Sequence, residues 1–230
     1  MESNLAYSRY GDGAPLVLLH GNGENQQIWD AQIAALSAIR LVYTVDTRGH
    51  GDTPRGTAPF TLAQFAADLS TFLDQHALSK VDLLGFSDGG NIALLFSLQH
   101  PERINRLIVC GANLYPTGMK PMVYCSLVAE YVRLCLISLF SSKATHKRDL
   151  FALMVREPHI RPSRLNALPF PTLVIAGSHD IISNRHTRRI ATSFPNAALR
   201  ILSGGHMLPC EQPEAFNAVV LDFLSSETRM

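Results

Sequence analysis

One serine of the 230-residue chain lies in a pattern that is typical of a nucleophile. Ser87 is the centre of the pentapeptide Gly85-Phe86-Ser87-Asp88-Gly89, which follows the apolar run 81–86 and precedes a helical pattern over 89–100. A turn between a strand and a helix projects a serine hydroxyl from the backbone, and flanking glycines let the two backbones approach closely. The pentapeptide alone often occurs by chance. Its place after an apolar strand favours a nucleophilic serine over an ordinary turn serine.

A histidine and an aspartate that follow later strands have the chemistry to activate this serine. A hydroxyl is a weak nucleophile at neutral pH and needs a neighbouring base. His206 follows a glycine pair after the apolar run 199–202, and Asp180 comes shortly after the run 172–176. A carboxylate on the second ring nitrogen holds an imidazole in one tautomer and stabilises its protonated form. We therefore predict Ser87 as nucleophile, His206 as base and Asp180 as acid. A loop role for His206 and a capping or turn role for Asp180 are the alternatives.

These side chains require a fold that brings the ends of distant strands together. Short apolar runs alternate with helical patterns along most of the chain, which is typical of strands buried on both faces and joined by crossover helices. The alternation predicts the α/β class, with a mostly parallel, doubly wound sheet and helices on both faces. Functional residues of such sheets lie at the carboxyl ends of the strands. The expected strands are 16–20, 41–46, 81–86, 107–110, 172–176 and 199–202.

Helix and turn signals predict the remaining elements. The expected helices run from a capping box at Thr61 to about 78, and over 89–100, 183–194 and 213–224. We expect 7–10 to pair antiparallel with 16–20 as an edge hairpin. The stretch of about 113–168 contains apolar helical patterns without a convincing strand. It predicts a small helical lid inserted into a single domain, 1–230.

Taken together, the motifs resemble the α/β-hydrolase superfamily, whose members carry nucleophile, acid and base in this chain order. The segment His20-Gly21-Asn22-Gly23 is similar to the family's oxyanion loop, and Asp46 to Thr53 is similar to its D-x-R-G-H-G segment. The resemblance covers nearly the whole chain and indicates a serine-nucleophile branch with a compact lid. It implies an oxyanion hole formed by the backbone N–H groups of Asn22 and Asp88. The start of a helix at Asp88 agrees, because a helix dipole favours negative charge there.

Several other side chains near these motifs have two interpretations each. The Asp88 carboxylate belongs to the first turn of a helix, where the dipole stabilises it. Alternatively, its charge beside the nucleophile would attract an amine-bearing ester. Arg48 and His50 more often tie down such a loop than bind a substrate acid. Leu127 and Tyr131 belong to an apolar stripe that is chiefly packing, and we predict them as candidate acyl-pocket residues.

Composition and charge exclude several classes of protein. Twenty Lys and Arg against nineteen Asp and Glu give a net charge of +1, too balanced for binding that neutralises many phosphates, so we expect no nucleic-acid partner. The four cysteines form no C-x-x-C pair, and we expect no metal site and no cofactor. The apolar stretch 122–140 contains Glu130 and Arg133, which argues against a membrane span. No targeting segment is visible, so we expect a cytoplasmic protein. The oligomeric state is left open.

The sequence thus predicts a serine hydrolase that cleaves a small or medium carboxylic ester through an acyl-enzyme on Ser87. A lactone, thioester or activated amide is a close alternative as the small-molecule substrate. The same fold and triad would also suit carbon–carbon bond hydrolysis, lyase or perhydrolase chemistry. A small-molecule receptor with slow turnover is the alternative outside catalysis.

Overall fold

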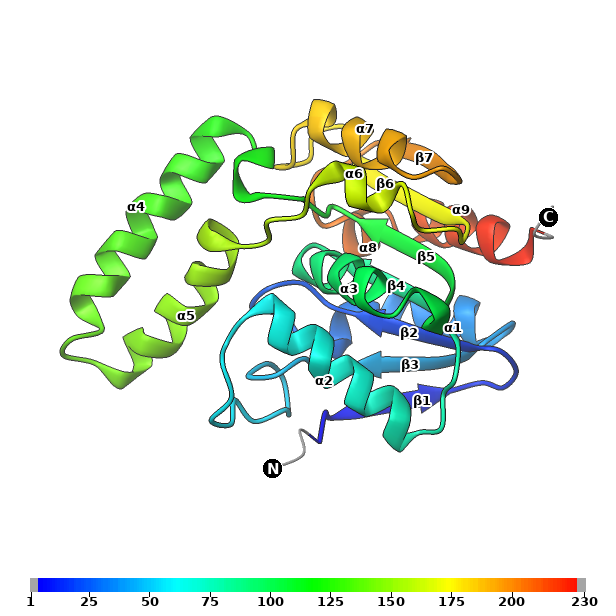
Figure 1. Ribbon diagram of the computed structural model, residues 1–230, viewed down its shortest axis with the longest axis horizontal. Helices are drawn as coiled ribbons and strands as arrows, with labels where there is room; N and C mark the ends of the chain where they lie inside the picture. The colour runs from blue at the N-terminus through cyan, green and yellow to red at the C-terminus, as the bar shows by residue number, and fades with distance from the viewer. Residues whose placement is uncertain (1–3, 227–230) are drawn as a thin grey trace.

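The computed structural model describes residues 4–226, which form a seven-stranded sheet with helices on both sides (Figure 1). The strands lie in the order β1-β3-β2-β4-β5-β6-β7. β1 runs antiparallel to β3, and the other neighbouring strands are parallel. The predicted α/β class with a mostly parallel, doubly wound sheet is confirmed. The strands are β1 (Tyr7–Tyr10), β2 (Pro15–Leu19), β3 (Leu41–Val45), β4 (Val81–Phe86), β5 (Ile104–Cys110), β6 (Thr172–Gly177) and β7 (Ala197–Leu202).

β1 lies at an edge of the sheet, but its partner differs from the prediction. The predicted hairpin between 7–10 and 16–20 is wrong, because β1 pairs with β3. β2 is an interior strand whose two edges are already occupied: Leu16 pairs with Val42 of β3 on one side and with Asp82 of β4 on the other. The outer edge of β3 is therefore the one that β1 can complete.

Helices cover the two faces of the sheet (Figure 1). On one face Leu69 of α2, Phe96 of α3 and Ile190 of α7 belong to one apolar cluster. On the other face Leu36 of α1 and Phe216 of α9 belong to a second cluster, which also includes the start of α8. The helices are α1 (Asp30–Ser37), α2 (Leu62–Gln75), α3 (Asp88–Gln99), α7 (Asn184–Ser193), α8 (Leu208–Glu211) and α9 (Pro213–Ser225), with 3₁₀ turns η1 (Gln26–Trp29), η2 (Pro101–Arg103) and η3 (Pro116–Gly118).

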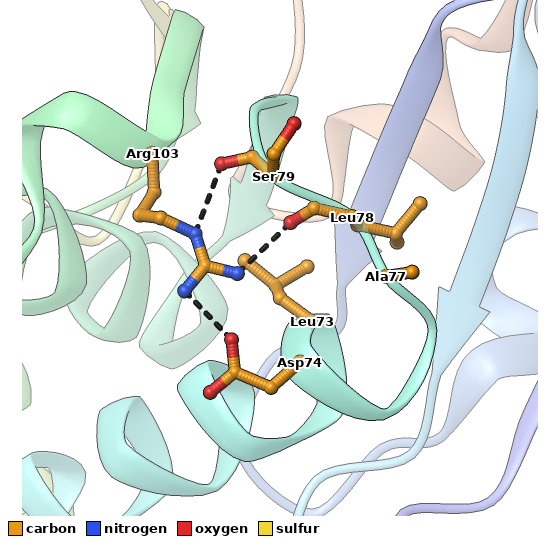
Figure 2. A pocket seen from close by; sticks show the side chains of 6 residues that line it. All are labelled: Leu73, Asp74, Ala77, Leu78, Ser79 and Arg103. Carbon is orange, nitrogen blue, oxygen red and sulfur yellow. Dashed lines mark hydrogen bonds and ion pairs between the residues drawn. The ribbon is translucent and has the colours of Figure 1, made fainter.

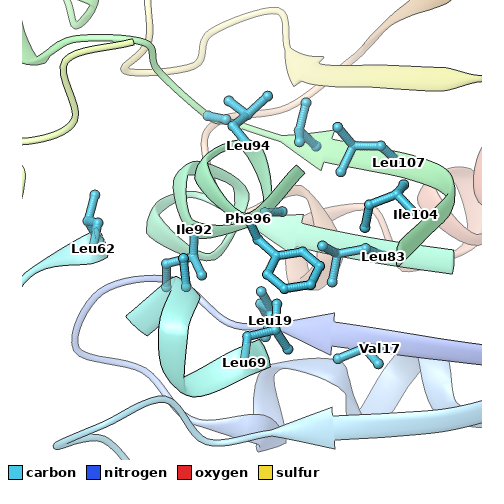
Figure 3. Close-up of a cluster of buried hydrophobic side chains, with 14 of the residues drawn as sticks. Val17, Leu19, Leu62, Leu69, Leu83, Ile92, Leu94, Phe96, Ile104 and Leu107 are labelled. Atoms are coloured by element: carbon cyan, nitrogen blue, oxygen red, sulfur yellow. The ribbon is translucent and has the colours of Figure 1, made fainter. Parts of the chain in front are cut away.

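The central strands contribute side chains to both clusters. Figure 3 shows part of the first cluster, in which Val17 and Leu19 of β2 lie with Leu69 of α2 and Phe96 of α3. Leu16 and Leu18 of the same strand belong to the second cluster. Successive side chains of a strand point to opposite faces of a sheet, so burial of both faces requires the continuous apolar runs seen in the sequence. This packing fixes the carboxyl end of β2, from which a loop of the candidate site emerges.

α2 ends earlier than its sequence pattern indicates. The predicted end near residue 78 is wrong, because the helix ends at Gln75. Ala77 adopts a left-handed conformation (φ 53°), and the Leu78 N–H donates to the Leu73 carbonyl at 2.8 Å. These are features of a Schellman helix stop, which satisfies the last carbonyls of a helix. Arg103 of η2 closes the turn by donating to the Leu78 carbonyl at 2.9 Å.

The chain between β5 and β6 is helical and projects from the sheet (Figure 1). It contains α4 (Pro121–Ile137), α5 (Ser142–Arg156) and α6 (Pro162–Leu165), all within the range predicted for a lid. α4 and α5 form a hairpin in which α5 is the helix nearer the sheet. Asp149 of α5 pairs with Arg55 at 3.1 Å, which ties the hairpin to the loop before α2. Within residues 4–226, no helix is long and apolar enough to span a bilayer.

Candidate active site

Ser87 lies in the turn between β4 and α3, at the carboxyl edge of the sheet. Its backbone is left-handed (φ 52°, ψ −120°), a strained conformation for a residue with a side chain. A Cβ on Gly85 would collide with the Gly89 carbonyl, and a Cβ on Gly89 would collide with the Leu19 carbonyl. The Ser87 N–H donates to the Cys110 carbonyl of β5 at 2.8 Å. The two glycines are therefore required by the close approach of α3 to the strands around the serine.

The structure brings His206 and Asp180 to Ser87 from two other strand ends. His206 Nε2 lies 2.9 Å from Ser87 Oγ, and His206 Nδ1 lies 2.7 Å from Asp180 Oδ1. His206 follows β7 and Asp180 follows β6, where Asp180 Oδ1 also accepts a hydrogen bond from the Ile182 N–H at 2.8 Å. The carboxylate is fully buried, whereas the imidazole remains partly exposed. In this geometry a proton on Nδ1 is donated to Asp180, which leaves Nε2 as an acceptor for the serine proton.

Two residues that the sequence analysis did not single out shape the position of the imidazole. Gly111, directly after β5, is left-handed (φ 62°), and a Cβ there would lie 2.7 Å from His206 Cε1. Glu211 of α8 accepts hydrogen bonds from the Gly205 N–H at 2.5 Å and the Met207 N–H at 3.3 Å, on either side of the histidine. A glycine after a strand and a glutamate in a short helix carry no local signal for such contacts, because the contacts exist only in the folded chain.

The loop that follows β2 lies against the serine. A Cβ on Gly21 would lie 3.0 Å from Ser87 Cβ. The Gly21 carbonyl accepts a hydrogen bond from His20 Nδ1 at 2.7 Å, and the Thr47 N–H donates to His20 Nε2 at 3.0 Å. Burial lowers the pKa of His20, in agreement with a neutral ring that both donates and accepts. These bonds fix the backbone beside Asn22, one of the two predicted oxyanion donors.

Asp88 begins α3, and only 7% of its surface is exposed. Its carboxylate accepts hydrogen bonds from Asn22 Nδ2 at 2.8 Å and from Asn91 Nδ2 at 3.0 Å. Burial raises the pKa of the carboxyl, and the two amide donors act in the opposite direction. Its backbone N–H lies in the first turn of the helix, where such groups have no acceptor within the helix. These contacts favour the structural interpretation of the side chain over attraction of an amine-bearing ester.

The two candidate acyl-pocket residues lie on α4, the outer helix of the hairpin. Leu127 and Tyr131 are half buried, and the Arg156 guanidinium lies over the Tyr131 ring, 5.2 Å from its centroid. The helix that contacts the loop after β2 is α5, whose Leu150 carbonyl accepts a hydrogen bond from Asn22 Nδ2 at 3.0 Å. Contact of Leu127 and Tyr131 with a substrate therefore stays a prediction.

Known proteins resemble this chain in both sequence and structure. Residues 14–126, which include the loop of Asn22 and the turn of Ser87, match the family model described as the alpha/beta hydrolase fold. The crystal structure of a hydrolase from Pseudomonas aeruginosa PA01 is 26% identical and has a TM-score of 0.81, covering 96% of this chain and 94% of that chain. The chain belongs to the α/β-hydrolase superfamily.

Relatives of this α/β-hydrolase are named for hydrolysis of several bonds. The "Putative carbamate hydrolase RutD" of Caulobacter sp. (strain K31) is 29% identical over 94% of this chain and 92% of that protein. The 3-oxoadipate enol-lactonase 2 of Acinetobacter baylyi is 24% identical over 94% of this chain and 91% of that protein. The pimeloyl-[acyl-carrier protein] methyl ester esterase of Aeromonas hydrophila is 34% identical over 48% of this chain and 42% of that protein. The chain is accordingly an enzyme of the hydrolase class.

The segment from Asp46 to Thr53 ties itself to the body of this α/β-hydrolase. Arg48 donates two hydrogen bonds to the Asp68 carboxylate of α2, at 2.7 and 2.6 Å, and both side chains are buried. His50 Nδ1 donates to the Arg48 carbonyl at 3.0 Å, and burial, reinforced by the neighbouring His20, lowers the pKa of His50 to about 4. The contacts show that Arg48 and His50 hold the loop in place, and they do not favour binding of a substrate acid.

Across residues 4–226, no three His, Cys, Asp or Glu side chains lie close enough together to hold a metal ion.

Proposed function

We propose that this α/β-hydrolase is a serine hydrolase that cleaves a small or medium carboxylic ester through an acyl-enzyme on Ser87. The observation that carries the proposal is the unbroken series of hydrogen bonds from Asp180 through His206 to Ser87, with lengths of 2.7 and 2.9 Å. A hydroxyl is activated when a base lies within about 2.6–3.2 Å and a third group orients that base. The series satisfies both conditions.

In the proposed acylation step, Ser87 Oγ attacks the ester carbonyl carbon while His206 Nε2 takes the hydroxyl proton. Negative charge develops on the carbonyl oxygen, and the backbone N–H groups of Asn22 and Asp88 donate hydrogen bonds to it. Asp180 accepts a hydrogen bond from Nδ1 and stabilises the imidazolium. The imidazolium then gives its proton to the leaving alkoxide. An alcohol departs, and the acyl group remains on Ser87 Oγ.

In the proposed deacylation step, water replaces the alcohol. His206 Nε2 takes a proton from the water as its oxygen attacks the acyl carbon, and the same two N–H groups hold the developing charge. The tetrahedral intermediate collapses with return of the proton to Ser87 Oγ. One ester and one water thus give one alcohol and one acid, with no change of oxidation state.

The relatives support a bond to a carboxyl-type carbon as the one that is cleaved. Their names describe a carbamate hydrolase, an enol-lactonase and a methyl ester esterase. Attack on the carbonyl carbon, stabilised by an oxyanion hole, suits each of these bonds. A small or medium ester is the proposed substrate, and a lactone is the nearest alternative.

A panel of esters that varies acyl length and charge tests the proposal. The wild type should turn over at least one ester many times, and Ser87→Ala should lower kcat by about 10⁴-fold or more. Ser97→Ala is the matched control, because Ser97 is a buried serine of α3, the helix that begins directly after Ser87, and its hydroxyl has no hydrogen-bond partner within residues 4–226. Near-normal rates in Ser87→Ala would refute the proposal. Turnover of a diketone but of no ester would favour carbon–carbon hydrolysis, and binding without turnover would favour a receptor.

A further inference from the structure

The Asn22 side chain joins three parts of the molecule that meet over the candidate site. It extends from the loop after β2 and donates from Nδ2 to the Asp88 carboxylate of α3 at 2.8 Å and to the Leu150 carbonyl of α5 at 3.0 Å. An amide nitrogen has two protons, so both donors are engaged. The backbone N–H of the same residue is one of the two proposed oxyanion donors. Any movement of residue 22 relative to Ser87 therefore strains two hydrogen bonds.

The Asp88 end of this link is a fixed reference point. Asp88 directly follows Ser87 and is itself held by Asn91 Nδ2, which donates to its Oδ1 at 3.0 Å. Asn91 is fully buried, and its Oδ1 accepts a hydrogen bond from the Asn113 N–H at 2.8 Å. Hydrogen bonds to a carboxylate are stronger than those between neutral groups. Asp88 thus ties Asn22 to the turn that bears the nucleophile.

The Leu150 end depends on the seating of α5 on the body. Two contacts hold α5 there: Asp149, next to Leu150, pairs with Arg55 at 3.1 Å, and Glu157, directly after the last residue of the helix, accepts a hydrogen bond from the Leu62 N–H at 2.8 Å. The rest of the hairpin extends away from the sheet (Figure 1). A shift of α5 would withdraw the Leu150 carbonyl and leave the Asn22 amide with Asp88 alone.

We propose that Asn22 is a positioning residue, whose side chain aligns the oxyanion-donating backbone with Ser87 and makes that alignment depend on the seating of α5. The inference rests on the proposed serine-hydrolase function and adds to it a control of kcat by the helical insertion. Oxyanion donors act mainly in the transition state, so their misalignment lowers kcat more than it changes KM. A purely structural side chain would affect stability without this split between kcat and KM.

Three variants at this link and one control separate its two ends. Asn22→Ala removes both hydrogen bonds, and Asn22→Asp places a carboxylate against Asp88 and against the Leu150 carbonyl. The double variant Asn22→Asp/Asp88→Asn restores a hydrogen bond between positions 22 and 88 with donor and acceptor exchanged, but still sets two acceptors against each other at Leu150. Asn25→Ala is the matched control: it removes a hydrogen bond of the same loop, in which Asn25 Oδ1 accepts from the Gln27 N–H at 2.9 Å on the exposed surface.

The readouts are active sites counted with a fluorophosphonate, steady-state kinetics on the best ester, and inhibition by a trifluoromethyl ketone that mimics the tetrahedral intermediate. Asn22→Ala should lower kcat by about 10- to 100-fold while KM stays within about threefold. The ketone should bind more weakly by the factor lost in kcat/KM. Asn22→Asp should have a lower kcat than Asn22→Ala. The double variant should regain part of the kcat that Asn22→Asp loses. Asn25→Ala should keep the wild-type kcat.

Each part of the inference has its own contrary result. Wild-type kcat and ketone affinity in Asn22→Ala would overturn the positioning role while leaving the proposed function intact. Wild-type kcat in the double variant would overturn the dependence on α5. A wild type that turns over no ester and takes no fluorophosphonate would overturn both the proposed function and the inference. If Asn22→Ala does not fold, the double variant, which keeps the bond between positions 22 and 88, supplies the comparison.

Discussion

One oxygen of the Asp180 carboxylate is buried without a hydrogen-bond donor among the described residues. Its Oδ1 accepts from His206 and Ile182, whereas no donor within residues 4–226 reaches the buried Oδ2. A buried carboxylate with an unmet acceptor is costly unless positive charge lies nearby. Protonation of His206 supplies that charge, and the proposed reaction forms this imidazolium in its transition state. The proposed transition state therefore places positive charge beside this buried carboxylate.

Asp180→Asn should retain the fold and lose most of the activity. The new amide can donate to Nδ1, which moves the ring proton to Nε2 and removes the acceptor that Ser87 needs. We expect kcat to fall by about 10⁴-fold, while the midpoint of urea unfolding stays close to that of the wild type because a buried charge has been removed. Steady-state kinetics at neutral pH and urea titration measure the two quantities. A loss of less than about tenfold would mean that Asp180 does not set the tautomer.

The side chains located by sequence are those whose position follows from the order of the strands. Ser87, Asp180 and His206 each come shortly after an apolar run, and parallel strands deliver their carboxyl ends to one edge. Gly111 and Glu211, which restrict the position of the His206 imidazole, could not be located in this way. Their contacts join segments that are distant in the sequence and depend on how loops pack, which no local pattern records.

At the scale of elements, the Arg48–Asp68 pair should be a main link between the loop after β3 and α2. Both side chains are buried, and the two hydrogen bonds measure 2.7 and 2.6 Å. Arg48→Met leaves the Asp68 charge buried with Gln64 Nε2 as a remaining donor, at 3.0 Å. Removal of one partner of a buried pair typically costs about 3–5 kcal/mol. We expect a loss of this size in the free energy of unfolding by urea.

An exposed ion pair provides the control for that prediction. Arg103 pairs with Asp74 at 2.9 Å and also donates to the Leu78 and Ser79 carbonyls (Figure 2). The Asp74 side chain is 64% exposed, so Asp74→Asn should change the free energy of unfolding by less than about 1 kcal/mol. Equal losses in Arg48→Met and Asp74→Asn would show that burial does not strengthen the Arg48 pair.

Elements were predictable where burial is complete and less so where it is partial. β4 is buried at each position and matches its apolar run. β7, at the sheet edge, has half-buried and exposed residues, and its first residues Ala197 and Ala198 gave no strand signal. α1 escaped prediction because it is short and begins without a side-chain cap, and α8 has only four residues. Partial burial weakens the hydrophobic periodicity on which such predictions rest.

At the scale of the whole molecule, the fold class was predictable although one strand pairing was not. Repeated strand–helix alternation with right-handed crossovers restricts the chain to a parallel sheet covered on both faces. The partner of β1, by contrast, is decided by competition for edges among all strands, and β2 has both of its edges occupied. The hairpin rule considers only neighbours in sequence, so it could not anticipate this result.

The acid stability of the whole molecule should depend on two buried neutral histidines. His50 and His186 have pKa values lowered to about 4, chiefly by burial, and His186 Nε2 accepts a hydrogen bond from the Leu114 N–H at 2.9 Å. The unfolded chain, with a histidine pKa near 6.5, binds more protons than the folded chain between pH 6.5 and 4. The free energy of unfolding should therefore fall as pH decreases through this window.

The contribution of each histidine is bounded by about 1.4 kcal/mol per pH unit. The carboxyls of half-buried Glu24 and buried Asp88, whose pKa values desolvation raises, act in the opposite direction, so the histidine effect is read as a difference between variants. His186→Gln keeps an acceptor for the Leu114 N–H but cannot be protonated. When urea unfolding is measured at pH 7 and at pH 5, the free energy of unfolding should decrease less between the two pH values in this variant than in the wild type. Equal losses in the two proteins would mean that His186 is already charged when buried, or that its pKa is not lowered by folding.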